Sequence, residues 1–171
     1  MVPFAHEFSL LIARDQQGSI AFWDAPENVH KDGILATSTV PAHPKVLEQV
    51  PAARALARRI AEKLNYVGVF AIEFFASDEG PVFNEMAPRV HNSGHWTIEG
   101  AATSQFENHI RAIAGLPLGD TAATSPSCMI NLIGSSGNKN DLLKLPYVHL
   151  HMYGKEERVG RKIGHINIHL W

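Results

Sequence analysis

Apolar and polar residues alternate over the first part of the chain, a pattern typical of β-strands. The run HEFSLLIARD (residues 6–15) leads into the turn residues QQG and then into SIAFWD (residues 19–24), which predicts a hairpin. Residues 29–50 show no such period and contain prolines and a glycine, so we expect irregular structure there.

A helical period begins at Pro51, a residue suited to the first turn of a helix. Apolar side chains then recur three or four residues apart, at Ala53, Leu56, Ala57, Ile60 and Leu64. Residues 97–114 predict a second helix, which ends at Gly115.

Two strand patterns, YVGVFAIEFFA and PVFNEMA, flank the turn residues SDEG and predict a second hairpin. After a Pro- and Thr-rich segment, further strands are expected at CMINLIG, YVHLHMYG and KIGHINIHL, with a short helix near Asp141. The predicted class is α+β. We expect an antiparallel sheet with flanking helices over residues 1–116, a linker over 117–126 and a small β-rich domain over 127–171.

Composition narrows the class of protein. Apolar residues make up 45% and charged residues 19%, which is typical of a globular chain. No apolar run approaches the roughly 18 residues that span a bilayer, and the start MVPFAHEFSL lacks the features of a signal peptide. The single cysteine, Cys128, cannot form an internal disulfide. We therefore expect a cytoplasmic protein without a membrane partner.

Charge is unevenly distributed although the net charge is only −2. Residues 144–171 carry five Lys or Arg side chains against two Glu side chains. This basic tail is a solvated face or a site for a small anionic ligand. Its short length and lack of interleaved aromatic residues argue against nucleic-acid binding.

Two glutamates lie within the predicted SDEG hairpin. If its turn is centred near Glu79, residues whose numbers add to 158 face each other, and Glu73 and Glu85 form such a pair. Opposed carboxylates on one face repel each other, and a divalent cation such as Mg²⁺ would relieve that repulsion. In the alternative, the register differs by one residue and each Glu faces solvent or an arginine. Glu7, on the first strand, either approaches this site or pairs with Arg14.

A longer resemblance rests on the run NEMAPRVHNSGHWTIEGAATSQFENHIRAIAGLPLGD, which resembles the signature of the N5-carboxyaminoimidazole ribonucleotide synthases. These are ATP-grasp enzymes of purine biosynthesis. The resemblance extends over nearly the whole chain, through EFSLLIARDQQG, ENVHKDGIL, YVGVFAIEFF and VHLHMYGKEERVGRKIGHIN. It implies the second half of an ATP-grasp domain followed by the small C-terminal domain.

The resemblance also implies roles for individual residues. Glu73 and Glu85 match the family's metal ligands for Mg-ATP, and Asn84 lies beside them on the same strand. Many other ATP-grasp enzymes have an asparagine two places after the second Glu, where this chain has Ala87, so a third side-chain ligand is not expected.

Catalytic and phosphate-binding roles follow from the same resemblance. The catalytic positions facing bicarbonate and carboxyphosphate are Arg89, His91 and Asn92. The segment KEERVGRK matches the region that binds the ribonucleotide phosphate, through Lys155, Arg161 and Lys162.

The implied activity is an ATP-dependent ligase reaction. Bicarbonate and ATP give carboxyphosphate and ADP, and 5-aminoimidazole ribonucleotide is carboxylated with release of phosphate. The resemblance further implies a homodimeric full-length protein.

Part of the family pattern is not found in this sequence. The first ATP-grasp subdomain, with its nucleotide-binding lysines and glycine-rich lid, has no match here, and the tail stops soon after GHIN. We therefore expect a C-terminal portion with a truncated last domain that is inactive by itself. A non-catalytic ligand-binding or assembly module and another ATP-grasp carboxylase remain alternatives.

Overall fold

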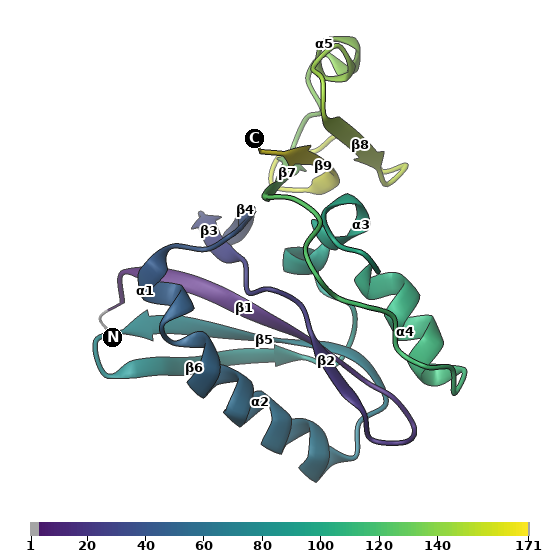
Figure 1. The fold of residues 1–171 in the computed structure, drawn as a ribbon. Coiled ribbons are helices and arrows are strands. Elements are labelled where there is room, and N and C mark those ends of the chain that lie inside the picture. The colour runs from purple at the N-terminus through teal and green to yellow at the C-terminus, as the bar shows by residue number, and fades with distance from the viewer. Residues whose placement is uncertain (1–3, 171) are drawn as a thin grey trace.

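The computed structural model describes residues 4–170 and shows a large sheet with helices on both sides of its first part (Figure 1). In chain order, the elements up to the end of the long helix α2 are β1 (His6–Arg14), β2 (Ile20–Phe22), β3 (Glu27–Lys31), β4 (Ile34–Val40), α1 (Pro44–Leu47) and α2 (Val50–Leu64). The remaining ones are β5 (Gly68–Ser77), β6 (Gly80–Ala87), the 3₁₀ turn η1 (Asn92–Gly94), α3 (Thr97–Gly100), α4 (Gln105–Ile113), β7 (Ser127–Ile133), α5 (Lys139–Leu143), β8 (Val148–Met152) and β9 (Lys162–His169).

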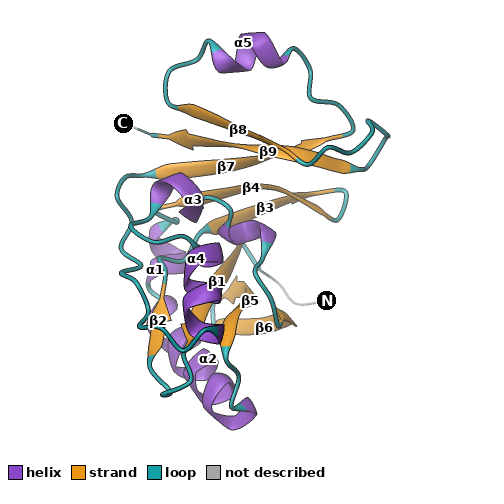
Figure 2. Ribbon diagram, turned by 90° about the vertical axis from the view of Figure 1, so that its right-hand side faces the viewer, coloured by secondary structure: helices purple, strands orange, loops and turns teal. Residues whose placement is uncertain are grey.

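The strands form one sheet in the order β6-β5-β1-β3-β4-β7-β9-β8, and β2 pairs with β1 (Figure 2). Every pairing is antiparallel. The C-terminal strands therefore continue the sheet of the first part, because β7 pairs directly with β4. The β4–β7 pairing joins strands on the two sides of residues 117–126. The division into two domains at that segment stays a prediction.

Alternation along β1 and β5 divides the core between the two faces of the sheet. Phe8, Leu10 and Ile12 pack with the apolar side of α2 in one buried cluster. Leu11 and Ala13 point the other way, into a second cluster that includes Trp23, Val69 and Trp96. Each face of these strands is thus buried over part of its length, which explains their nearly continuous apolar runs.

The predicted elements are largely present. The β1–β2 hairpin, α2, the β5–β6 hairpin and the C-terminal strands with α5 between β7 and β8 all form where the pattern placed them. The expectation of irregular structure over residues 29–50 was wrong, because β3, β4 and α1 lie there. Asp32 and Gly33 both have positive φ, of 52° and 73°, and close a tight hairpin. An Asp-Gly pair is a strong hairpin signal that the absence of a period concealed.

The single helix expected over residues 97–114 was also wrong. The chain forms the short α3, leaves the helix at Ala101, which bridges to Ala123, and starts α4 at Gln105. The Ser104 side chain caps α4 by accepting a hydrogen bond from the backbone N–H of Glu107. A Ser followed three residues later by a Glu is a helix-start signature, and here it divides the helical pattern.

Candidate active site beside the β5–β6 hairpin

Ser9, Glu73 and Glu85 form a row across three strands. Ser9 on β1 faces Glu73 on β5, and Glu73 faces Glu85 on β6. Directly paired residues project from the same face of a sheet. The predicted opposition of the two carboxylates is confirmed.

Glu73 and Glu85 face each other because β6 contains a β-bulge. Near the turn, Phe74 faces Phe83, whereas past the bulge Glu73 faces Glu85, so Asn84 is the extra residue of β6. In an unbroken ladder, Asn84 would face Glu73 and Glu85 would project from the opposite face. Bulges commonly redirect a side chain beside a functional site, and this one directs Glu85 toward Glu73.

The row opens into a polar cavity of about 440 Å³. The residues that line it come from β1, the β3–β4 hairpin, β5, β6, the segment after β6 and the start of β9: Glu7, His30, Gly33, Leu35, Glu73, Asn84, Glu85, Arg89, His91, Asn92 and Lys162. Seven of the nine residues named above for metal, metal-adjacent, catalytic and phosphate-binding roles are among them.

Glu73 lies at the charged centre of this cavity. Burial raises the pKa of its carboxyl, and the charges of Glu85 and Glu7 raise it further, while His30 acts in the opposite direction. Glu7 itself lies 2.7 Å from Nδ1 of His30. Glu7 therefore approaches the site, and Arg14 instead donates to the backbone oxygen of Tyr66.

His91 is buried at the cavity wall, with its Nε2 atom 3.7 Å from a carboxylate oxygen of Glu73. Burial lowers its pKa to about 4, and Arg89, Lys162 and His30 contribute to the lowering. The ring is therefore neutral at physiological pH.

The segment that carries His91 is held by Gln105. This fully buried side chain accepts from the backbone N–H of His91 and donates to its backbone oxygen, at 2.9 and 2.7 Å. Gly94 permits the close approach, because a Cβ there would overlap Leu11 and Gln105. The HNSG segment is thus fixed against β1 and the start of α4.

Comparison with known proteins identifies the family. The model of the ATP-grasp domain matches residues 1–106, and that of the phosphoribosylaminoimidazole carboxylase C-terminal domain matches residues 127–170. The chain belongs to the ATP-grasp family.

Among curated relatives, this ATP-grasp chain is 53% identical to the N5-carboxyaminoimidazole ribonucleotide synthase of Brucella melitensis, over 96% of this chain and 46% of that protein. It is 51% identical to the enzyme of that name from Escherichia coli, over 98% of this chain and 46% of that protein. The chain therefore spans a little under half the length of these curated relatives.

Solved structures of similarly named enzymes are also similar to this chain. The crystal structure of N5-carboxyaminoimidazole ribonucleotide synthetase from Thermus thermophilus superposes with a TM-score of 0.96 at 54% identity, covering 99% of this chain and 47% of that one. The synthase from Aspergillus clavatus, in complex with ADP and 5-aminoimidazole ribonucleotide, gives 0.91 at 32% identity, covering 99% and 48%.

Two features of the ATP-grasp site fit a bound divalent cation. The ligand atoms of Glu73, Glu85 and His91 lie within 4.8 Å of one another. Paired carboxylates suit Mg²⁺, which is commonly held by one or two carboxylates together with substrate phosphates. The pKa of Glu73 is raised first by burial and further by the charges of Glu85 and Glu7, and a bound cation would offset these effects.

Two of the predicted catalytic residues present unused hydrogen-bonding capacity. Both amide atoms of Asn92 are buried without a protein partner, although buried polar groups are normally paired. Arg89 is exposed and uses Nη1 to donate to the backbone oxygen of Val90. Both side chains line the cavity, so the remaining donors of the exposed Arg89 are open to a ligand, and the buried amide of Asn92 lacks a partner at the cavity wall.

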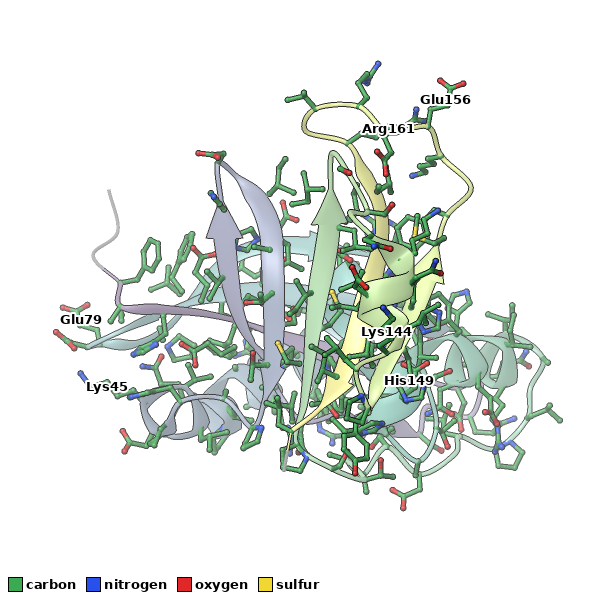
Figure 3. All side chains as sticks on the ribbon, turned by 90° about the horizontal axis from the view of Figure 1, so that it is seen from above. Lys45, Glu79, Lys144, His149, Glu156 and Arg161 are labelled. Atoms are coloured by element: carbon green, nitrogen blue, oxygen red, sulfur yellow. The ribbon has the colours of Figure 1, made fainter. Side chains whose placement is uncertain are left out.

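The basic tail is only partly brought to the site. Lys162, at the start of β9, lines the cavity with Arg89 and His91. Burial lowers its pKa, and the charges of Lys155 and Arg89 lower it further. Lys155 is exposed, with Nζ 5.5 Å from the ring centre of Tyr153. Arg161 is not among the lining residues and, like Glu156, belongs to the loop that projects between β8 and β9 (Figure 3).

Three residues of the site, His30, Ser93 and Gln105, were not predicted from the sequence. His30 lies on β3, within the segment expected to be irregular. Ser93 and Gln105 act on His91 through buried hydrogen bonds that no local period indicates. The Asp-Gly turn after His30 was the one usable signal, because it predicts the strand that carries this histidine.

No helix within residues 4–170 is long and apolar enough to cross a membrane.

Proposed function

We propose that this chain supplies the metal-binding and bicarbonate-binding part of a site that carboxylates 5-aminoimidazole ribonucleotide at the expense of ATP. The observation that carries the proposal is the convergence of Glu73 and Glu85 with Arg89, His91 and Lys162 in one cavity. The relatives with this name, at about half sequence identity over nearly the whole chain, support the same reaction.

The chemistry requires that two anions be brought together. An oxygen of bicarbonate attacks the γ-phosphorus of ATP, the bond to the bridging oxygen breaks, and carboxyphosphate and ADP result. The exocyclic amine of the ribonucleotide then takes the carboxyl group, and phosphate leaves. Positioning and charge neutralisation account for most catalysis of phosphoryl transfer.

Glu73 and Glu85 would hold Mg²⁺, which when bound neutralises phosphate oxygens. Arg89 offers a planar set of donors that matches a carbonate or carboxyphosphate oxyanion. Asn92 orients the same ligand through its unpaired amide donor and acceptor. Lys162, partly desolvated, attracts the anionic groups more strongly than an exposed lysine would. Lys155 and Arg161 remain proposed contacts of the ribonucleotide phosphate from the adjoining loop, and Asn84 remains a proposed neighbour of ATP and the metal.

Because the chain spans a little under half of its curated relatives, we expect the 171 residues alone to lack bicarbonate-dependent ATPase activity. An incomplete clamp leaves the phosphates in water, where each charge contact weakens severalfold. A hybrid joining the preceding part of the Escherichia coli relative to this chain should restore ADP release that depends on the ribonucleotide.

The hybrid also tests the site itself. Glu85→Ala should abolish most of the stimulated ADP release, whereas Glu79→Ala, in the exposed turn of the same hairpin, should leave it unchanged. Stimulated turnover by the 171 residues alone would contradict the need for the other half. A folded but inactive hybrid would support the alternative of a non-catalytic module.

A further inference from the structure

We propose that Ser93, supported by Ser9, fixes the tautomer of His91, so that Nδ1 is unprotonated and the Nε2–H bond faces the cavity. His91 then acts as a hydrogen-bond donor to an oxyanion. It serves neither as a metal ligand nor as a base through Nε2. The use of this donor in carboxylation rests on the proposed function, whereas the tautomer itself does not.

The backbone of Ser93 gives the first constraint. Its N–H donates to Nδ1 of His91 at 3.3 Å, as the cap of the short η1 turn. A backbone N–H can donate but cannot accept, so Nδ1 must present a lone pair. In a neutral imidazole the proton must then lie on Nε2.

The hydroxyl of Ser93 gives the second constraint. Its Oγ lies 2.9 Å from the same Nδ1, and because Nδ1 accepts, the hydroxyl must donate to it. Ser9 in turn donates from its own Oγ to Ser93 Oγ at 2.7 Å. Both serines are fully buried, so water does not compete for these bonds. The hydrogen bonds therefore run in one direction, from Ser9 through Ser93 to His91.

The position of Ser9 connects this chain of bonds to the carboxylate row. Ser9 faces Glu73 across the β1–β5 ladder, so the strand that carries the first metal-binding carboxylate is paired to the strand that orients the histidine. The two functions are thus built on one rigid sheet and keep a fixed separation.

The other end of the ring faces Glu73 at 3.7 Å from Nε2, too long for a good hydrogen bond. The Nε2–H group is therefore available to a ligand oxygen in the cavity. A histidine that binds a metal normally donates its other N–H to a carboxylate or carbonyl. His91 accepts at that position, so the cation site consists of the two glutamates without the histidine.

Side-chain ¹⁵N NMR of the 171-residue chain tests this directly, at a pH above the ordinary pKa of histidine. For His91 we expect a shift typical of an unprotonated nitrogen at Nδ1 and of a protonated nitrogen at Nε2. In Ser93→Ala, only the amide contact at 3.3 Å remains, a weaker constraint than the hydroxyl bond at 2.9 Å, so both shifts should move part of the way toward values averaged over the two tautomers. Ser9→Ala should cause a smaller movement in the same direction.

Ser38→Ala is the matched control. Ser38 is also fully buried and donates to Asn28 at 2.8 Å, so its loss removes a comparable bond elsewhere and should leave the His91 shifts unchanged. A protonated Nδ1 in the unsubstituted chain would overturn the proposal, as would identical His91 shifts in Ser93→Ala. Because the test needs no turnover, it is independent of the hybrid assay: an inactive hybrid with the expected tautomer would refute only the proposed function.

Discussion

Glu73 is a residue where folding and the proposed metal binding have opposite requirements. It lies in the middle of β5 among fully buried apolar neighbours, close to two other glutamates. Its raised pKa means that the folded state disfavours the carboxylate form. Charged side chains in such a position cost stability unless a partner compensates, as is common at functional sites.

We therefore expect Glu73→Gln to stabilise the metal-free chain at neutral pH by about 1 kcal/mol, the usual size of such gains. Since the folded pKa of Glu73 is raised, the cost of its charge is present at neutral pH and disappears as the pH falls and the carboxyl is protonated. Urea denaturation at pH 7 and pH 4 should show the gain at the higher pH only. Glu79→Gln, at an exposed turn, should change neither value, and a loss of stability in Glu73→Gln would refute this account.

At the scale of elements, a column of histidine rings joins the C-terminal strands to the segment before α3. His165 on β9 lies between His95 and His151, with ring centres 4.7 and 4.5 Å apart. Tyr153 contacts Nδ1 of His165 at 2.7 Å, and Glu99 on α3 contacts Nε2 of His151 at 2.8 Å. The elements thus meet through polar side chains, with the buried His165 at the centre.

This column predicts sensitivity to acid. Burial lowers the pKa of His95 to about 4 and that of His165 to about 3, from ordinary values of 6.5. As the pH drops below about 6.5, these histidines bind protons in the unfolded chain but stay unprotonated in the folded chain. The free energy of unfolding should therefore fall. Denaturation between pH 7.5 and 5 measures this fall.

His165→Asn should flatten the pH dependence of the free energy of unfolding, because it removes one buried histidine whose pKa is lowered in the folded state. The exposed His149 gives the control, since His149→Asn should leave the slope unchanged. A slope unaffected by His165→Asn would show that the acid sensitivity arises elsewhere.

At the scale of the whole molecule, the pairing of β4 with β7 joins the two regions that match family models, residues 1–106 and 127–170, into one sheet. Ser38 faces Met129 across this ladder, and Met129 is fully buried in the cluster with Trp23 and Trp96. Lys162 reaches the cavity because β9 is the next strand of the same sheet. A shared ladder and a shared core predict that the described residues unfold as one unit.

Met129→Ala tests whether the described residues unfold as one unit. Truncating this buried methionine should lower the free energy of unfolding by about 2–5 kcal/mol. The midpoints reported by far-ultraviolet circular dichroism and by the NMR signals of His151 and His165 should fall together. Leu145→Ala, at a side chain 54% exposed, should shift neither. Separate midpoints for the C-terminal strands would instead favour two independent domains divided at residues 117–126.

The sequence by itself determined the elements whose signals are local. Apolar spacing located α2, and alternation with a short turn located the β5–β6 hairpin and opposed Glu73 to Glu85. Even there the count was right only because the bulge at Asn84 offset a turn that is one residue tighter than assumed. Two local signals, the Asp32–Gly33 turn and the Ser104 cap, lie in the two segments that the periodicity misassigned.

Only the tertiary structure decided which distant side chains meet. Nothing local to Ser9, Ser93 or His91 indicates that their polar atoms form a chain, and nothing local to KEERVGRK separates Lys162 at the cavity from Arg161 outside it. Periodicity fixes the face on which a side chain projects, whereas its partner depends on strand order and register between segments far apart in sequence. Those are set by the packing of the whole chain, and so the carboxylate pair could be predicted while its surroundings could not.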